Sequence, residues 1–589
     1  MHNETALTPV GQSGTINTKR LTGENAFRVH RLKWAVRYFS QAVSFFSYSH
    51  SHCIPMTESI LLPELIAITA QRTPQAIALT SGAANLSYAD LSTGVSQFAS
   101  GLRALGLKRG ERVAIYLEKR FETVTASFGA PAAGAVFVPL NPLLKPEQVA
   151  FILRDCNVRV LVTSPERLAL LSGVLGECSD LAHVVVTAPK QEGGGNVGSI
   201  AVCQWQDLLN GPLRAGHRVI DVDMAAILYT SGSTGKPKGV VLSHRNMVAG
   251  AKSVASYLEN SSRDTLLAAL PLSFDAGFSQ LTTAFHTGAR VVLLNYLMPR
   301  DVLKAMEREK VTGLTAVPPL YIQLAQLDWP TAINSNLRYF ANTGGRMPRE
   351  TLTLLRQRVP KARPFLMYGL TEAFRSTYLP PEEVDRRPDS IGKAIPNAEI
   401  LVLREDGSTC DPDEPGELVH RGALVGQGYW NDAEKTAERY KLLASDAPGR
   451  HPGLQLPEYA VFSGDTVRMD AEGFLYFIGR RDEMMKTSGY RVSPTEVEEI
   501  LYATKMVGEC VAFGVDHPVL GNAIHIIATY AIPTKARGIN DLLSECKARM
   551  PAYMVPAGIE IVEGPLPRNP NGKIDRKLLS TDWVARHAA

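Results

Sequence analysis

Hydrophobic and polar positions alternate between a helical and an extended pattern from about residue 86 onward. Apolar side chains recur at helical spacing over residues 91–105, between a Ser87–Asp90 capping box and Gly106, which predicts a helix with both ends marked. Strand-like runs follow at residues 112–117, 135–139 and 158–163, with a second helical run at residues 146–155. Strands that alternate with helices predict an α/β fold with a doubly wound, mostly parallel sheet and ligands at the carboxyl ends of its strands.

The pattern changes near residue 480, where the charged run 479–482 is typical of a hinge. Beyond it, one helical run and two strand-like runs, at residues 495–502, 508–515 and 524–531, predict a small α+β unit. We therefore expect a large N-terminal domain at residues 56–479, a small mobile C-terminal domain at residues 480–581 and a tail at residues 582–589.

The composition is that of an ordinary globular chain, with 589 residues of which 45% are hydrophobic and 20% charged. No apolar run approaches the roughly 18 residues that a membrane-spanning helix needs. The seven cysteines are far apart and include no C-x-x-C pair, which excludes the usual zinc and dithiol motifs. Sparse cysteines of this kind are typical of a reducing compartment, so we expect a cytoplasmic protein.

The net charge is concentrated in the first 55 residues. Six of the 62 basic and two of the 58 acidic side chains lie there, a net of +4, and the remaining 56 of each sign cancel. Because residues 56–589 carry no net charge, we do not expect them to bind nucleic acid. The compositional break predicts that residues 1–55 are a disordered or upstream-start extension. Alternatively, residues 28–46 form a basic amphipathic helix that associates weakly with an anionic membrane.

A phosphate-binding loop is the sharpest chemical signal in the chain. Residues 229–239 have the sequence YTSGSTGKPKG and follow the apolar, strand-like run 224–228. The glycines permit close backbone approach, the hydroxyls donate to phosphate oxygens and the lysines supply counter-charge. It is not a Walker A loop, because Pro237 stands where that motif needs a magnesium-binding hydroxyl. The expected phosphate contacts are Thr230, Ser231, Gly232, Ser233, Thr234, Gly235, Lys236 and Lys238.

Further motifs, together with this loop, resemble those of the adenylate-forming superfamily and occur in that family's order. They are NTGG at 342–345, MYGLTE at 367–372, GEL at 416–418, SGD at 463–465, the stretch 479–491 and NGKIDR at 571–576. The resemblance covers residues 61–579 and implies an acyl-CoA synthetase-like fold and an enzyme that activates a carboxylic acid with ATP. Residues 367–387 and 486–491 look most like the acyl-CoA ligases associated with exosortase A systems.

The resemblance implies roles for single residues. Lys573 matches the lysine that bridges the substrate carboxylate and the α-phosphate, where a mobile cation stabilises charge that develops in the transition state. Glu372 matches a magnesium-binding carboxylate, which suits a hard cation that bridges phosphate oxygens. Further matches are Thr371 at the α-phosphate, Tyr368 at the adenine, Asp465 and Arg480 at the ribose, and Gly344 and Gly345 against the purine and the acyl group. Gly369 of the same motif is also expected to bind the nucleotide.

The same resemblance implies a second half-reaction, which follows a rotation of the small domain about Asp482. Gly489 and Arg491 match the segment that presents a pantetheine thiol to the adenylate. Lys486 lies on that segment and is counted, with Thr230, among the expected catalytic residues. The expected ligands are ATP, Mg²⁺ and either CoA or the phosphopantetheine of a carrier protein.

The sequence does not identify the acid. Asp275 lies in an otherwise apolar stretch, where it either pairs with the ammonium of an amino-acid substrate or caps the following helix. Phe274, Phe278 and Ser279 are expected beside it in the acyl pocket.

Three functions therefore remain open. The main prediction is a two-step ligase that forms an acyl-adenylate from a small-molecule carboxylic acid and then a CoA thioester. The alternative is a ligase that loads an amino acid or acyl group onto a separate carrier protein. A non-catalytic adenylate-binding protein is disfavoured, because it need not keep Lys573, Glu372 and Asp465 together.

Overall fold

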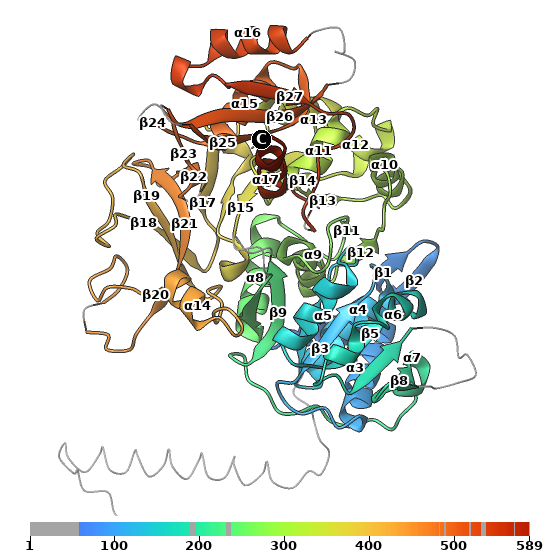
Figure 1. The fold of residues 1–589 in the computed structure, drawn as a ribbon. Coiled ribbons are helices and arrows are strands. Elements are labelled where there is room, and N and C mark those ends of the chain that lie inside the picture. Colours follow the sequence, from blue (N-terminus) through green and yellow to red (C-terminus); the bar gives the residue numbers. More distant parts are fainter. Residues whose placement is uncertain are drawn as a thin grey trace, which may run out of the picture. The chain divides into compact units, whose positions relative to one another are not determined.

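The computed structural model describes residues 58–587 except 188–195, 231–236, 452, 482, 488–489, 518–519, 532–537 and 571, and it leaves out the side chains of residues 196, 486 and 491 (Figure 1). Contacts join Glu58–Ala589 into one unit that contains three sheets. Within the described residues, no helix is long and apolar enough to cross a bilayer. The predicted disordered or membrane-associated segment lies outside the described residues and stays a prediction.

The first sheet contains the alternating elements that the sequence predicts. Its strands are β3 (Arg112–Tyr116), β4 (Val136–Pro139), β5 (Val158–Thr163), β6 (His183–Val186), β7 (Asn196–Val197), β8 (Ile200–Gln204), β9 (Met224–Thr230) and β10 (Lys238–Ser243). They lie in the order β10-β9-β4-β3-β5-β6-β8-β7, parallel from β9 to β8 and antiparallel at both edges. The helices of this part are α2 (Glu64–Arg72), α3 (Tyr88–Ala104), α4 (Phe121–Ala132), α5 (Pro146–Asp155), α6 (Pro165–Leu171) and α7 (Trp205–Leu209).

The ends of α3 follow from local chemistry. The Ser87 hydroxyl oxygen accepts the N–H of Asp90 at 3.1 Å, and Gly106 after the helix takes a φ of +82° that suits glycine. The predicted N-cap at Ser87 and the predicted helix end are thus confirmed, but the capping box is not: the Asp90 carboxylate accepts the Ser87 hydroxyl at 2.6 Å instead of the Ser87 backbone N–H.

The second sheet is larger and only half of it is parallel. Its strands are β1 (Ile77–Ser81), β2 (Ala84–Ser87), β11 (Thr265–Ala268), β12 (Arg290–Leu293), β13 (Gly313–Ala316), β14 (Tyr339–Asn342), β15 (Arg363–Tyr368), β16 (Thr377–Leu379), β17 (Ser390–Ala394), β18 (Ala398–Leu403), β19 (Gly416–Gly422), β20 (Tyr440–Leu442), β21 (Tyr459–Met469) and β22 (Leu475–Arg480). Strands β15-β14-β13-β11-β12-β1 are parallel, whereas β18-β19-β21-β22-β17-β16 form an antiparallel half. Its helices are α8 (His244–Tyr257), α9 (Asp275–Thr287), α10 (Pro299–Arg308), α11 (Pro318–Ala325), α12 (Thr331–Asn336), α13 (Arg349–Arg358) and α14 (Ala433–Arg439).

The third sheet belongs to the C-terminal part. It consists of β23 (Met485–Thr487), β24 (Tyr490–Val492), β25 (Val507–His517), β26 (Gly521–Tyr530) and β27 (Gly558–Ile561), with α15 (Pro494–Ala503), α16 (Ile539–Arg549) and α17 (Arg576–His587). The predicted helix and two strands of this part correspond to α15, β25 and β26. The mixed α/β class with a smaller α+β part is therefore confirmed.

One hydrophobic core joins the two large sheets. It contains side chains of β3, β4 and β9 from the first sheet, of β11 and β15 from the second, and of α3, α4, α8 and α9. Phe278 of α9 is fully buried there, with its ring centroid 4.8 Å from that of Phe137 and 5.5 Å from that of Phe128. Because the core fixes α9, it also fixes the functional residues at the start of that helix.

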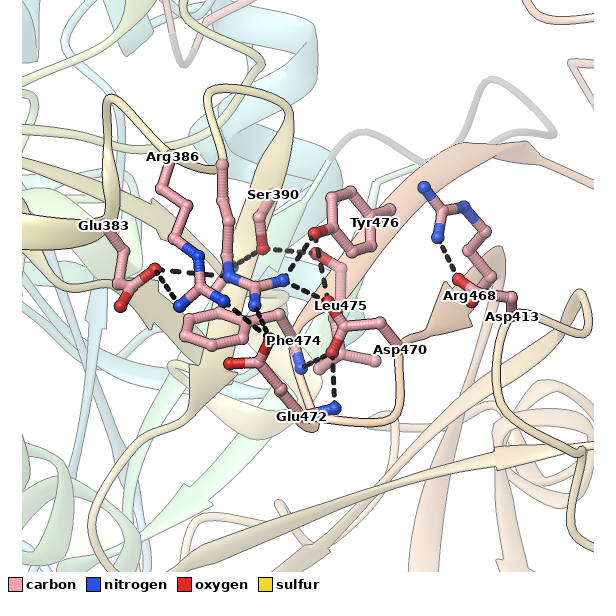
Figure 2. Close-up of polar contacts among 12 residues, drawn as sticks. Glu383, Arg386, Ser390, Asp413, Arg468, Asp470, Glu472, Phe474, Leu475 and Tyr476 are labelled. Carbon is pink, nitrogen blue, oxygen red and sulfur yellow. Dashed lines mark hydrogen bonds and ion pairs between the residues drawn. The ribbon is translucent and has the colours of Figure 1, made fainter.

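An arginine cluster holds the turn between β21 and β22. The Arg387 side chain is 8% exposed and forms ion pairs with Glu383, Asp470 and Glu472. Its guanidinium lies 4.1 Å from the ring centroid of Phe474. Figure 2 shows Glu383, Asp470 and Glu472 converging on one guanidinium beside the Phe474 ring. The cluster supports the two strands that carry two of the expected nucleotide contacts.

Candidate functional site

Lys573 lies on a tight turn between β27 and α17. The turn is closed by the N–H of Asn569, which donates to the Lys573 carbonyl at 2.8 Å, and by the Asn569 side chain, which accepts the N–H of Lys573 at 3.1 Å. Gly572 takes a φ of +81° there. The side chain of Asn141, which sequence reasoning missed, donates to the carbonyl of Pro570. The turn is therefore attached to the large N-terminal part.

The Lys573 side chain lies beside Gly344 and Phe274 of that part. A Cβ atom added to Gly344 would lie 2.9 Å from Cε of Lys573 and 3.3 Å from Val317, so glycine is required for this approach. The Lys573 ammonium lies 5.8 Å from the ring centroid of Phe274. The structure thus brings together three residues that the sequence selected separately, namely Lys573, Gly344 and Phe274.

The charge of Lys573 is influenced by several site residues. Burial lowers the pKa of Lys573, the nearby carboxylates of Asp275 and Asp465 raise it, and the Arg480 guanidinium lowers it. Because desolvation dominates, this ammonium has lost much of its hydration and interacts strongly with any anion that enters.

Asp465, Tyr368 and Arg480 form one group, in which Tyr368 ends β15, Arg480 ends β22 and Asp465 lies within β21. The Tyr368 hydroxyl donates to Oδ2 of Asp465 at 2.5 Å, and Nε of Arg480 lies 3.4 Å from Oδ1. Asp465 and Arg480 face each other across β21 and β22. Burial raises the pKa of Asp465, whereas Arg480 and Tyr368 lower it. The carboxylate is therefore oriented as a hydrogen-bond acceptor, as a ribose contact requires.

The glycines near this group leave no space for side chains. A Cβ atom on Gly345 would lie 3.2 Å from Pro318, and one on Gly369 would lie 3.1 Å from Cα of Arg375. Thr371 is buried just beyond Gly369. These positions let the backbone itself form the wall of the site.

Glu372 lies in a short 3-10 turn directly after β15, and an aromatic residue from another segment holds it. The Tyr429 hydroxyl donates to Oε1 of Glu372 at 2.5 Å, and Nζ of Lys238 lies 5.6 Å from the Tyr429 ring centroid. Burial and the Glu372 carboxylate together raise the pKa of Tyr429, so it remains a hydrogen-bond donor. Sequence reasoning missed Tyr429, because only the fold places it beside the MYGLTE motif.

We expect Tyr429→Phe to weaken the binding of magnesium-ATP, because it frees the Glu372 carboxylate to reorient. Supporting residues of this kind typically change metal-site affinity by about 10- to 100-fold. Steady-state kinetics should show a raised KM for magnesium-ATP. The matched control is Tyr440→Phe. The Tyr440 hydroxyl also reaches Glu372, but it lies 3.5 Å from the backbone carbonyl and does not orient the carboxylate. Equal KM values for the two variants would contradict the assigned role of Tyr429.

A strained turn separates Glu372 from Arg375. Phe374 has φ +58° and ψ −53°, and the N–H of Arg375 donates to the Ala373 carbonyl at 2.6 Å, which is a γ-turn with positive φ. Such strain persists only where the surroundings impose it. Here the Phe374 ring is fully buried, and a Cβ atom on Gly250 would lie 2.3 Å from it. The turn directs Arg375 away from the nucleotide group and into the core.

Arg375 forms an ion pair with Asp275. Its Nη1 lies 3.3 Å from Oδ2 of Asp275, and the two side chains are 2% and 4% exposed. Asp275 is the first residue of α9, which has no side-chain cap. Burial raises the pKa of Asp275, whereas Arg375 and Lys573 lower it. Neither sequence-based alternative for Asp275 included this partner, although Arg375 is the single charged residue between Glu372 and Glu382.

A small cavity lies beside this pair. Its polar wall consists of Ser279, Gln280, Thr283, Thr315, Tyr339 and Arg375. Ser279 is thus on the cavity wall, and its place in an acyl pocket stays a prediction. Phe278, the preceding residue, lies instead in the core against Phe128 and Phe137, because adjacent helical residues point in different directions.

Several predicted residues lie outside the described part. Thr230 ends β9 and Lys238 begins β10, and these two residues pair across the hairpin. The residues between them that were expected to bind phosphate, Ser231, Gly232, Ser233, Thr234, Gly235 and Lys236, are not described. The same holds for Asp482 and Gly489, whereas the backbones of Lys486 and Arg491 pair in β23 and β24. These assignments stay predictions.

Two family profiles match the chain. The profile described as AMP-binding enzyme matches residues 66–430, and that described as AMP-binding enzyme C-terminal domain matches residues 496–573. The first match alone covers more than half of the chain.

Individual relatives fall into two groups. The L-proline–[L-prolyl-carrier protein] ligase of Streptomyces coelicolor is 31% identical, over 86% of this chain and 94% of the relative. The feruloyl-CoA synthase of an Amycolatopsis species is 30% identical, over 86% of this chain and 95% of the relative. A linear gramicidin synthase of Brevibacillus parabrevis is also 30% identical, but the chain spans only 6% of its length.

A solved structure shares the fold. The anthranilate CoA ligase in complex with anthranoyl-AMP superposes with a TM-score of 0.79 at 25% identity, over 90% of this chain and 98% of that one. Carrier-protein ligases and CoA ligases are thus both similar to this chain.

Proposed function

The chain belongs to the AMP-binding enzyme family, and we propose from this that it joins a carboxylic acid to a thiol in two steps, with ATP cleaved to AMP and pyrophosphate. The family membership confirms the predicted superfamily and an enzyme that uses ATP to activate acids. The observation that carries the proposal is the position of Lys573 against Gly344 and Phe274, within electrostatic reach of Asp275 and Asp465.

In the first step, a carboxylate oxygen of the acid attacks the α-phosphorus of ATP. The bond to the bridging oxygen breaks, pyrophosphate leaves and acyl-AMP remains. Both reactants are anionic, so their approach needs positive charge between them. The partly desolvated ammonium of Lys573 supplies that charge on a turn tied to Asn569 and Asn141. Asp465 accepts hydrogen bonds from the ribose and so orients the nucleotide.

Glu372 is the proposed magnesium ligand. Among the described residues, no group of three or more His, Cys, Asp or Glu side chains is arranged to hold a metal ion. A single carboxylate still fits Mg²⁺, because this ion is commonly held by one or two carboxylates together with waters and substrate phosphates. When bound, the ion would neutralise charge on the phosphate oxygens. Tyr429 would keep the Glu372 carboxylate turned toward it.

In the second step, a pantetheine thiolate attacks the acyl carbon and AMP leaves. We favour CoA as the thiol, and a separate carrier protein is the second candidate, since relatives of both kinds are similar to this chain. The proposed rotation of residues 480–581 about Asp482 would remove Lys573 and bring in Lys486, Gly489 and Arg491. No general base is assigned, because a free thiol with a pKa near 8.5 is already partly ionised at neutral pH.

Two finer assignments belong to the same proposal. The motifs at residues 367–387 and 486–491 support a place among the acyl-CoA ligases associated with exosortase A systems. A cytoplasmic location is supported by the free thiols of Cys156, Cys178, Cys203, Cys410, Cys510 and Cys546. Weak membrane association through residues 28–46 remains a separate prediction, tested by vesicle flotation of the full chain and of a chain that begins at Met56.

The proposal is tested by pyrophosphate release across a panel of fatty, aryl, hydroxy and amino acids. We expect release that depends on one class of acid, followed by a thioester, detected by mass spectrometry, when CoA is added. Release without a CoA thioester, but with loading of a carrier protein, would select the second candidate. ATP binding with no release for any acid would support a non-catalytic protein.

A further inference from the structure

The ion pair of Asp275 and Arg375 is electrically neutral. The guanidinium of a buried arginine stays protonated, so Asp275 is its counter-ion and the pair carries no net charge. Nη1 of Arg375 also donates to the Phe374 carbonyl at 3.0 Å, and its guanidinium lies 5.8 Å from the Phe374 ring centroid. The strained turn therefore fixes the arginine in place.

Polar atoms around this pair still lack hydrogen-bond partners. Within the described residues they are Oδ1 of Asp275, Nε of Arg375, Oε1 of Gln280 and Oγ1 of Thr283. Three of these four residues line the cavity, and the set contains both donors and acceptors. An unpaired buried polar atom destabilises the folded protein, because it has lost its bonds to water and gained none in return. A ligand group that satisfies these atoms would therefore be strongly preferred.

The cavity is also small. It has a volume of about 10 Å³, roughly the room for one water molecule. Its apolar wall consists of Val254, Leu258, Leu266, Ala276 and Met367. Such a space takes the end of a short chain and excludes a long alkyl tail.

We propose that the acid activated by this enzyme is short and carries a neutral hydroxyl group that enters this cavity. The inference rests on the proposed function. Inside the cavity, a hydroxyl accepts from Nε of Arg375 and donates to Oε1 of Gln280, two unpaired atoms of residues that line its wall. An ammonium would bring an uncompensated charge to a carboxylate that Arg375 already neutralises, and a second carboxylate would do the same at the arginine. An alkyl end leaves all of these atoms unpaired.

The first test compares acids of one length on the full chain. Pyrophosphate release is measured with 3-hydroxybutanoate, 4-hydroxybutanoate, butanoate, 4-aminobutanoate and succinate. We expect a hydroxy acid to exceed butanoate in kcat/KM by about 10²-fold or more, since sites built to bond a hydroxyl reject analogues without one by up to 10⁴–10⁵. Equal or better turnover of butanoate, the amino acid or succinate overturns the inference.

The same measurement separates this inference from the proposed function. Release that occurs only with long-chain, aryl or amino acids overturns the hydroxy-acid assignment and leaves the ligase intact. No release with any acid overturns both.

Thr283→Val provides a test that changes no charge. The substitution is isosteric and removes a hydroxyl that has no partner in the structure. We expect it to reduce the preference for the hydroxy acid over butanoate at least severalfold. Thr282→Val is the control, because the Thr282 hydroxyl donates to the Ser279 carbonyl at 3.3 Å within α9 and Thr282 is not on the cavity wall. Identical effects of the two substitutions on this preference contradict the inference.

Breaking the ion pair should change selectivity in opposite directions. Asp275→Asn leaves Arg375 without its counter-ion. We expect it to raise kcat/KM for succinate relative to kcat/KM for the hydroxy acid. Arg375→Gln leaves the Asp275 carboxylate without its counter-ion. We expect it to raise kcat/KM for 4-aminobutanoate instead. ATP binding by each variant shows whether it is folded. If both variants are folded and their selectivity shifts in the same direction, or does not shift, the electroneutrality argument is overturned. If either variant does not fold, the comparison of Thr283→Val with Thr282→Val decides whether the inference holds.

Discussion

Replacing Lys573 with alanine is expected to lower the rate of acyl-adenylate formation by roughly 10²- to 10³-fold, the effect typical of one lost preorganised charge contact. The ammonium is held beside Gly344 and Phe274, and burial lowers its pKa. In the proposed reaction it acts where charge develops between the acid and ATP, so ATP binding should change little. Carboxylate-dependent exchange of pyrophosphate into ATP measures the rate, and calorimetry measures ATP binding.

The matched control is Lys577→Ala. Lys577 is exposed on α17, only four residues further along the chain. Its removal tests whether any loss of positive charge near this turn slows the reaction. An unchanged exchange rate in the Lys573 variant, or equal losses in both variants, would refute the assigned role.

Replacing Arg576 with methionine is expected to lower the free energy of unfolding of the C-terminal part by roughly 3–5 kcal/mol, as found when one partner of a buried ion pair is removed. Arg576 donates to Glu498 at 2.7 Å and to Glu483 at 2.6 Å. Glu498 is only 11% exposed and also accepts the N–H of Ala512 at 2.8 Å. Methionine would leave this carboxylate buried without its cation. Urea unfolding measures the change.

Arg586→Met is the control on the same helix. Arg586 pairs with Glu560, but these side chains are 53% and 29% exposed, and surface pairs contribute little. The prediction for Arg576 fails if the two variants unfold at the same urea concentration. A second readout is the adenylation rate, which should fall only for the Arg576 variant, because Arg576 begins the helix that follows the Lys573 turn.

Local patterns were sufficient to predict the first alternating helices and strands and those of the C-terminal part. The cap at Ser87, the glycine after α3 and the run 146–155 depend on neighbours within a few residues, and such interactions are visible in sequence. The antiparallel half of the second sheet was not predicted, because its pairing joins strands that are far apart in sequence, such as β17 and β22.

The site shows the same division between local and long-range information. The order of motifs along the chain was enough to establish the class of chemistry, since the glycine-rich loop, MYGLTE and NGKIDR need only be present in order. The folded chain was needed to show that Asp275 pairs with Arg375, 100 residues away, that Phe278 faces the core and that Tyr429 orients Glu372. These contacts could not be predicted because the role of a buried charge depends on its partner, and folding, not sequence order, brings the two together.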